Sequence, residues 1–225
     1  MKSFIGKPFL KNEELKGIIN KTKINYFYIK NQIDFRDYII KNISKDDDVL
    51  DIGKAMREKF DYLVCKSIET LDVNDYGDYP DIVFDLCSQE ITSLENKYDK
   101  IVCIAILEHV YNPFDAVKNL FKMLKPNGVV FGYVPYLYHY HAPKDLQFQD
   151  YFRFSKDALA YLFKDFSEIE LFPVRGRFST PFNLMFAGRW KKYIEKTGIN
   201  ILLDKMTTDE KNVKQCSGFN FILKK

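Results

Sequence analysis

The sequence has few of the features that mark disulfide-rich, zinc-binding or membrane-spanning proteins. It has 4 cysteines and 10 glycines among 225 residues, and no apolar run approaches about 18 residues, the length of a membrane-spanning helix. The cysteines have no paired spacing, and three of them lie in apolar runs. They therefore indicate reduced thiols rather than a disulfide or zinc framework. The first residues lack the long apolar stretch that directs secretion, so we expect a cytoplasmic protein.

The sequence also lacks a large excess of charge of either sign. The net charge of +3 is too small to indicate nucleic-acid binding. Aromatic residues are plentiful, with 20 Phe and 15 Tyr, and they supply enough apolar surface for a large core. The length suits one domain over residues 1–225. Within it, we expect residues 1–46 to form an N-terminal helical cap and residues 175–215 to be an insertion before the last strand.

Short apolar runs alternate with helical patterns along the chain. Residues 100–106 are almost continuously apolar, as in a central parallel strand that is covered on both faces. Asn112-Pro113 favours the start of a helix, and two amphipathic helices are expected within residues 11–45. This alternation predicts an α/β fold with a doubly wound, mostly parallel sheet. The expected strands lie within residues 46–53, 67–72, 81–85, 100–106, 129–134, 169–174 and 217–223.

Polar or turn-forming residues end four of these strands. They are Gly53, Asp72, Asp85 and the Ile104-Ala105 pair. Ligands of open α/β sheets bind at the carboxyl ends of the strands. Asp72 follows Gly53 by 19 positions, close to the spacing of about 20 at which an acid meets ribose hydroxyls. A single acid at this spacing also suits a turn or a helix cap, but four successive strand ends favour a ligand site.

The residues after Gly53 bear on which ligand binds. A dinucleotide needs several glycines to cradle its pyrophosphate, whereas Lys54-Ala55-Met56 follow here. S-adenosylmethionine has no phosphate and needs one close approach, an acid for its ribose and a partner for its carboxylate. Gly53 and Asp72 suit the first two requirements, and Lys54 or Arg36 suits the third. The sequence therefore favours a sulfonium cofactor over a dinucleotide.

With these residues the chain resembles the class I S-adenosylmethionine-dependent methyltransferases that act on small molecules. The resemblance covers about residues 47–175. It implies a Rossmann-like sheet of seven strands whose last strand is antiparallel. The matching segments are residues 49–53, Asp72, residues 81–86, residues 98–103, Leu107-Glu108-His109-Val110 and residues 124–128.

The resemblance also implies roles for individual residues. Gly53 would lie against the methionine part of the cofactor, Asp72 would bind the ribose, and Asp85 with Leu86 would contact the adenine. The chain departs from the family at Lys54-Ala55-Met56, where further glycines are usual. The full set of expected cofactor-binding residues is Asp51, Gly53, Lys54, Asp72, Val73, Asp85, Leu86, Ile104, His109 and Arg36; for His109, capping the turn is the alternative.

The segment after the fifth expected strand holds the candidate catalytic residues. It resembles a loop of methyltransferases in surface-saccharide biosynthesis, notably at Asp150-Tyr151-Phe152-Arg153-Phe154-Ser155. A hydroxyl acceptor benefits from a base, and histidine has the suitable pKa. We expect His141 first and His139 second in this role, with Asp145 as the orienting partner. The alternative is that these histidines only form hydrogen bonds within an aromatic loop.

Two further interpretations concern the same loop. His139, His141 and Asp145 have a spacing that a metal site could use, but no further strong ligand is evident, so no metal is expected. Asp150 and Arg153 are expected to form a structural ion pair rather than to take part in chemistry.

Residues 175–196 are locally basic, with six basic side chains and one acid. Arg175 and Arg177 open this segment, and arginine suits phosphate because its donors are forked. One interpretation is a lid or platform for an anionic acceptor; the alternatives are a dimer contact and a solvated helix.

Together these features predict an O-methyltransferase of a saccharide, phosphorylated or nucleotide-linked small molecule in surface polysaccharide biosynthesis. The competing hypotheses are N- or C-methylation of another metabolite and a catalytically degenerate scaffold that retains the cofactor fold.

Overall fold

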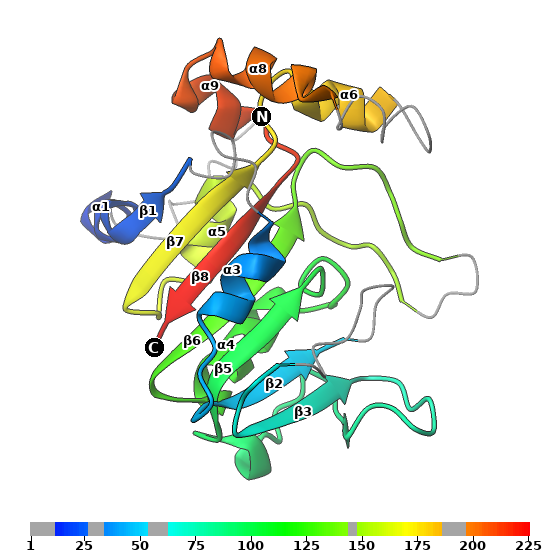
Figure 1. Ribbon diagram of the computed structural model, residues 1–225. Helices are drawn as coiled ribbons and strands as arrows, with labels where there is room; N and C mark the ends of the chain where they lie inside the picture. Colours follow the sequence, from blue (N-terminus) through cyan, green and yellow to red (C-terminus); the bar gives the residue numbers. More distant parts are fainter. Residues whose placement is uncertain (1–11, 27–33, 54–62, 144–147, 186–196) are drawn as a thin grey trace, which may run out of the picture.

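The protein folds around one eight-stranded sheet (Figure 1). The computed structural model describes residues 12–26, 34–53, 63–143, 148–185 and 197–225. The strands are β1 (Thr22–Ile24), β2 (Asp48–Ile52), β3 (Ser67–Asp72), β4 (Ile82–Val83), β5 (Tyr98–Ile104), β6 (Leu124–Pro135), β7 (Glu168–Val174) and β8 (Gly218–Lys224). Their order is β1-β7-β8-β6-β5-β2-β3-β4, and only β8 runs antiparallel to its neighbours. The doubly wound, mostly parallel sheet with an antiparallel last strand is therefore confirmed.

The strand count differs from the expected seven because β1 joins the sheet. Helices alone were expected in this part of the chain, but α1 (Asn12–Lys21) ends where Lys21 reaches the strand layer. Its ammonium group donates hydrogen bonds to the carbonyl oxygens of Lys164 and, at 2.7 Å, Phe166. Thr22–Ile24 then pair in parallel with β7, which would otherwise be the edge strand. Both end residues are β-branched, and such residues suit an extended strand.

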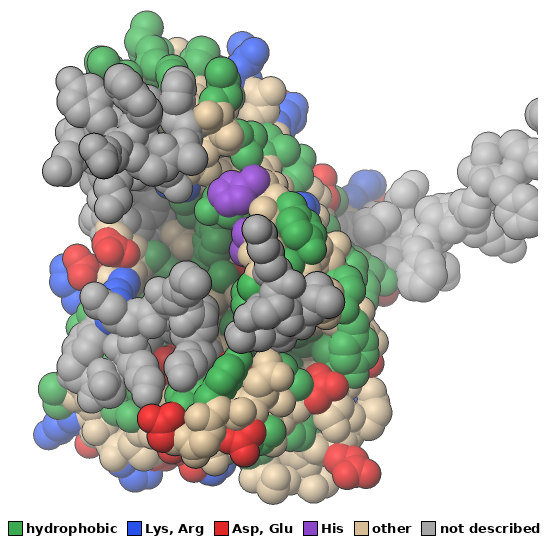
Figure 2. All heavy atoms as spheres, turned by 90° about the vertical axis from the view of Figure 1, so that its right-hand side faces the viewer, with side chains coloured by type: hydrophobic (Ala, Val, Ile, Leu, Met, Phe, Trp, Pro, Cys, Tyr) green, Lys and Arg blue, Asp and Glu red, His purple; other side chains and the backbone are tan. Residues whose placement is uncertain are grey.

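The carboxyl ends of β2, β3, β5 and β6 emerge at one edge of the sheet, on the right of Figure 1 and facing the viewer in Figure 2. The order β5-β2-β3 places the switch in strand order beside β2. Open α/β sheets form their ligand sites at such a switch, beyond the carboxyl ends of the strands.

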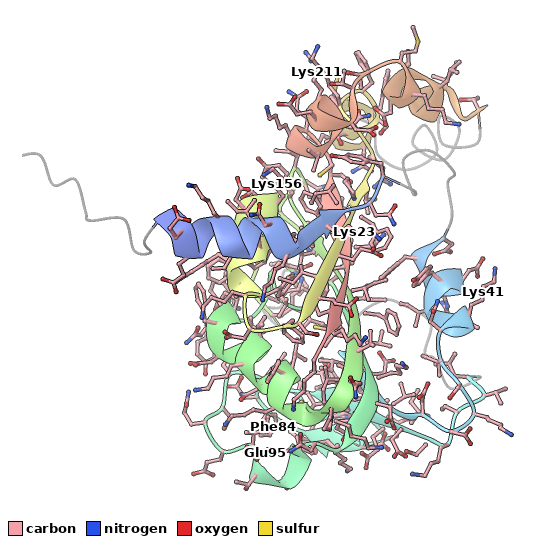
Figure 3. All side chains as sticks on the ribbon, turned by 90° about the vertical axis from the view of Figure 1, so that its left-hand side faces the viewer. Lys23, Lys41, Phe84, Glu95, Lys156 and Lys211 are labelled. Atoms are coloured by element: carbon pink, nitrogen blue, oxygen red, sulfur yellow. The ribbon has the colours of Figure 1, made fainter. Side chains whose placement is uncertain are left out.

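Helices cover both faces of the sheet (Figure 3). α1, α4 (Pro113–Met123) and α5 (Lys156–Leu162) lie on one face, and α3 (Phe35–Lys41), with Lys41 labelled, lies on the other. Asn112 is the N-cap of α4, and its side chain accepts a hydrogen bond from the Asp115 N–H at 3.3 Å. α3 buries Phe35 and Ile39 against Val102, Phe131 and Phe172 of the sheet.

Between β7 and β8, the described residues form three further helices (Figure 1): α6 (Ser179–Met185), α8 (Ile199–Lys205) and α9 (Asp209–Lys214). The buried carboxylate of Asp204 organises them, since it accepts hydrogen bonds from the backbone N–H groups of Gly176, Phe178 and Ser179 at 2.8, 2.8 and 3.1 Å. A 3-10 helix, η1 (Thr92–Leu94), precedes β5. No helix in the described ranges is long and apolar enough to cross a membrane.

A cluster of charges ties the amino ends of the central strands together. Asp48 accepts hydrogen bonds from Lys66, Ser67 and Lys125 at 2.9, 2.7 and 2.7 Å. Lys125 also donates to Asp99 at 2.6 Å, and Asp99 accepts from the Asp48 N–H. The two ammonium groups and the Ser67 hydroxyl hold the pKa of Asp48 well below its usual range. This cluster therefore joins β2, β3, β5 and β6 at the edge opposite the candidate site.

The Asp48 cluster predicts a specific dependence of stability on pH. Folding lowers the pKa of Asp48. The ionised side chain therefore makes its full contribution to the free energy of unfolding above the pKa of about 3.9 that it has in the unfolded chain, and this contribution is lost as the pH falls through the pKa of the folded protein. Asp48→Asn should therefore lower the thermal unfolding midpoint at pH 7, and the difference from the wild type should shrink at pH 3. The exposed Asp46→Asn is the control and should change neither value. An Asp48→Asn deficit of equal size at both pH values would contradict the assignment.

Candidate active site

Gly53 directly follows β2 and needs to be glycine. Its φ is +82°, a left-handed conformation that side chains disfavour, and its N–H donates to the Leu71 carbonyl at 2.8 Å. A Cβ atom at this position would lie only 2.2 Å from Cδ1 of Ile106 in the turn after β5. The backbone at Gly53 therefore lies unusually close to the turn that follows β5.

The two predicted acids lie at the expected strand ends. Asp72 is the last residue of β3, and one carboxylate oxygen accepts a hydrogen bond from the Asn74 N–H at 3.0 Å. Asp85 follows β4 and accepts hydrogen bonds from the Cys87 N–H at 2.8 Å and the Tyr111 hydroxyl at 2.9 Å. The Tyr111 hydrogen bond to this carboxylate raises the pKa of Tyr111 to about 12. Asp85 is thus held by its own turn and by the residue that precedes α4.

The other predicted cofactor residues differ in their accessibility. Asp51 and Leu86 are each 4 % exposed, whereas Val73 is 57 % exposed just after β3, and Ile104 ends β5. Arg36 lies in the first turn of α3, where its N–H donates to Asp34. Lys54 and Asp145 lie outside the described residues, as do Ala55 and Met56.

Two of the three histidines come together although 32 residues separate them in the sequence. Their Nε2 atoms, in His109 and His141, are 3.1 Å apart, and the rings meet edge to face. The carboxylate Oε1 of Glu108 lies 3.7 Å from His109 Nε2 and 3.8 Å from His141 Nε2. Figure 2 shows histidine side chains beside a recess in this face of the protein. Glu108, His109 and His141 are called the Glu–His–His cluster below.

Backbone hydrogen bonds join the two loops that carry this cluster. The N–H groups of Tyr151 and Phe152 donate to the Glu108 carbonyl at 2.8 and 3.2 Å. His109 Nδ1 lies 2.5 Å from the carbonyl oxygen of Gln149. The loop after β6 is therefore folded back onto the turn after β5, which explains how distant residues share one site.

Asp150 orients His141. Its carboxylate accepts a hydrogen bond from the His141 N–H at 2.9 Å and lies 3.2 Å from His141 Nδ1. Arg153 forms an ion pair with the same carboxylate, as the sequence predicted, and donates to the carbonyls of Tyr138 and His139. The sequence analysis gave the orienting role to Asp145, which lies outside the described residues. Within the described residues, Asp150 is an acid that contacts His141.

Electrostatics in the cluster follow from these contacts. The Glu108 carboxylate raises the pKa of His141, burial opposes this, and the Asp150 carboxylate adds to the increase. Burial alone would raise the pKa of Asp150, but the Arg153 guanidinium and the His141 N–H hold it at about 2. The loop therefore presents His141 with an ionised carboxylate at its Nδ1 side.

His139 lies apart from this arrangement. It is exposed, its ring stacks on Tyr138 at 4.2 Å, and its ring centre lies 6.3 Å from that of His141. The two predicted candidate bases are therefore not equivalent: His141 belongs to the cluster and His139 lies outside it.

Glu108 is the residue that sequence reasoning missed. Its side chain is fully buried, and neither carboxylate oxygen has a hydrogen-bond partner within the described part of the chain. The sequence shows an acid next to a histidine in an apolar segment, Leu107-Glu108-His109-Val110, but the burial of that acid depends on the loop that covers it.

The comparison with protein families decides the class of this fold and site. A family model described as a methyltransferase domain matches residues 24–167. The chain belongs to this methyltransferase family. The matched range includes β2 to β6, the Glu–His–His cluster and the loop that carries Asp150 and Arg153.

Solved structures show how widely this methyltransferase fold is used. An S-adenosylmethionine-dependent methyltransferase of Archaeoglobus fulgidus is 15% identical with a TM-score of 0.53, and the match covers 85% of this chain and 91% of that one. A Methanosarcina mazei methyltransferase is 14% identical with a TM-score of 0.51, covering 86% and 99%. The [4+2]-cyclase SpnF is 13% identical with a TM-score of 0.50, covering 85% and 79%. No curated protein matches the sequence.

The cofactor of this methyltransferase is S-adenosylmethionine. The strand ends fit it, because Gly53 gives a turn without a side chain directly after β2 and Asp72 offers an acid one strand away. The cyclase comparison shows that the same fold can hold other chemistry, so the acceptor has to be argued from the residues themselves.

The Gly53 turn predicts unequal effects of two alanine substitutions. Gly77 also has a positive φ, +87°, but a Cβ there meets nothing within 4 Å. Gly77→Ala should cost only the backbone strain, about 1–2 kcal/mol of unfolding free energy. Gly53→Ala should lower the unfolding free energy further, because the new Cβ atom clashes with Ile106. Adding Ile106→Ala to the Gly53→Ala variant should remove this clash and restore part of the difference between the two glycine variants. Chemical denaturation of the four proteins measures this, and equal losses for the two glycines would contradict the close approach.

Proposed function

We propose that this methyltransferase transfers the methyl group of S-adenosylmethionine to a hydroxyl oxygen of a small anionic acceptor. The acceptor class is a saccharide, or a phosphorylated or nucleotide-linked small molecule, of surface polysaccharide biosynthesis. The observation that carries the proposal is the Glu–His–His cluster at the carboxyl edge of the sheet, where β2 and β3 present Gly53 and Asp72.

Each strand end has a proposed role toward the cofactor. Gly53 lies against the methionine part, Asp72 accepts hydrogen bonds from the ribose hydroxyls, and Asp85 with Leu86 borders the adenine. Arg36 and Lys54 are the proposed partners of the cofactor carboxylate. The remaining proposed contacts are Asp51, Val73, Ile104 and His109.

The residues of the chain then have to position the acceptor and help its hydroxyl lose a proton. S-adenosylmethionine supplies a methyl group on a positively charged sulfur. Methyl transfer is an in-line displacement, so the acceptor oxygen must approach the methyl carbon opposite the sulfur. His141 is placed to activate that oxygen, because Asp150 fixes its Nδ1 side and leaves Nε2 turned toward the cluster. His139 is the second candidate base. Asp145 is the orienting partner that the sequence suggested, and the contacts of the described residues favour Asp150 in this role.

Two arginines at the same edge support an anionic acceptor. Arg175 directly follows β7 with a φ of 58°, and its guanidinium donates to the Ser217 hydroxyl at 3.3 Å. Arg177 is exposed two residues later, and its N–H is held by the Asn212 side chain at 3.0 Å. Guanidinium groups bind phosphate through two parallel hydrogen bonds. The rest of the basic segment, residues 186–196, lies outside the described residues.

The cofactor assignment predicts a loss of binding in one variant. Calorimetry of the wild type with S-adenosylmethionine should give a micromolar dissociation constant, and Asp72→Ala should abolish binding because the ribose loses its acceptor. Asp78→Ala is the matched control, since Asp78 is an exposed acid six residues later, and it should bind as the wild type does. A wild type that binds nothing at millimolar cofactor would favour the scaffold hypothesis instead.

The anionic acceptor predicts a change in KM alone. Arg175→Glu and Arg177→Glu should raise the KM of a phosphorylated or nucleotide-linked acceptor about 10-fold or more, because each replaces a favourable charge with a repelling one. The dissociation constant of S-adenosylmethionine should stay unchanged. Lys205→Glu, an exposed reversal in α8, is the control. Equal weakening of acceptor and cofactor binding would contradict the acceptor role.

A further inference from the structure

The Glu–His–His cluster contains a buried carboxylate that faces two histidine rings. Glu108 has 0% side-chain exposure, and both of its oxygens lack a hydrogen-bond partner there. A buried ionised carboxylate is costly unless a cation or several donors face it. The Nε2 atoms of His109 and His141 lie 3.7 and 3.8 Å from Oε1 of Glu108, which is too far for hydrogen bonds.

The outer nitrogens of both rings are already assigned. His109 Nδ1 lies 2.5 Å from the Gln149 carbonyl oxygen, which only accepts hydrogen bonds, so this nitrogen carries the proton. His141 Nδ1 lies 3.2 Å from the Asp150 carboxylate and 3.3 Å from the His139 carbonyl, which are again acceptors. In the neutral rings each Nε2 therefore has a lone pair, and the two lone pairs face each other across 3.1 Å.

Two lone pairs and a carboxylate around one point need a positive charge between them. A proton shared by the histidines would join the two nitrogens but would leave Glu108 without a hydrogen bond. A metal ion can contact all three atoms. Their separations are 3.1, 3.7 and 3.8 Å, and ligands about 2.0–2.2 Å from a tetrahedral zinc ion lie about 3.3–3.6 Å apart. Each separation lies within about 0.2 Å of that range, and an ion at this point would also face Glu108, which a proton shared by the two histidines does not.

We propose that Glu108, His109 and His141 bind a divalent transition-metal ion of the zinc type. Two imidazole nitrogens and one carboxylate oxygen with an open fourth position make up a typical catalytic zinc site. The hydrogen bonds of the outer nitrogens to a carbonyl and a carboxylate match the surroundings of metal-bound histidines, which they hold in the required tautomer. The partial exposure of the rings, 13% and 25%, leaves one side of the ion accessible.

The role of this ion rests on the proposed function, whereas its binding does not. An acceptor hydroxyl in the fourth position has a lowered pKa and releases its proton to water. The oxygen then forms a bond to the methyl carbon, and the carbon–sulfur bond breaks with its electron pair staying on sulfur. His141 thereby activates the acceptor through the ion rather than by taking the proton itself.

The experiment measures ion binding directly. The full-length protein is stripped with a chelator, dialysed, and titrated with Zn²⁺ by calorimetry and with Co²⁺ by visible absorption. One equivalent of Zn²⁺ should bind, and the Co²⁺ spectrum should show ligand-field bands without the thiolate charge-transfer band that a cysteine site gives. Glu108→Gln and His141→Gln should weaken Zn²⁺ binding at least 100-fold. Asp150→Asn, which keeps all three ligands, should weaken it about 10- to 100-fold.

The third histidine supplies the matched control. His139→Gln alters an exposed histidine of the same loop and should bind Zn²⁺ as the wild type does. Circular dichroism of each metal-free variant checks its folding. A folded wild type that takes up no Zn²⁺ at about 100 µM, or a His139→Gln variant that loses the ion as completely as His141→Gln, would overturn the proposal.

Cofactor binding in the same samples separates the two proposals. A protein that binds S-adenosylmethionine but no ion contradicts the metal site and leaves the proposed methyl transfer standing. A protein that binds the ion at this cluster but no S-adenosylmethionine supports the metal site and contradicts the proposed function.

Discussion

The burial of the Glu108 carboxylate is the constraint around which the carboxyl edge of this protein is organised. A charge without exposure needs compensation, and the chain surrounds it with two histidine rings from separate loops. Those loops meet because the Glu108 carbonyl accepts the N–H groups of Tyr151 and Phe152. The same residue thus holds the loop by its backbone and presents its side chain to the site.

Arg153 and Asp150 make this arrangement rigid. Arg153 joins the carbonyls of Tyr138 and His139 to the Asp150 carboxylate, and Asp150 in turn faces His141. Hydrogen bonds therefore join the two sides of the loop next to the Nδ1 side of His141. A site that binds an ion or activates a hydroxyl needs such support, because the geometry of its ligands has to be set before the substrate arrives.

The two edges of the sheet differ in how their charges are satisfied. At the amino edge, Asp48 and Asp99 share Lys125, and both carboxylates have close donors. At the carboxyl edge, Glu108 has no hydrogen-bond donor in the described residues. A satisfied cluster contributes to stability, whereas an unsatisfied buried group marks a place where a ligand completes the structure.

Local pattern in the sequence was sufficient for most of the fold. The apolar run of β5, the Asn112-Pro113 start of α4 and the turn at Gly53 each reflect short-range requirements of a buried strand, a helix start and a left-handed backbone. The extra strand β1 was not predictable in this way, since Thr22–Ile24 become a strand only because β7 offers an open edge. The contact between Asp150 and His141 likewise depends on how the loop folds back.

The sequence by itself determined the family, the strand ends and the acids that follow them, because periodicity and turn chemistry act over a few residues. Only the tertiary structure decided that His109 and His141 meet, that His139 stays outside, and that Glu108 is buried between them. Those facts depend on contacts between residues more than 30 positions apart, which loop hydrogen bonds create and local sequence does not encode.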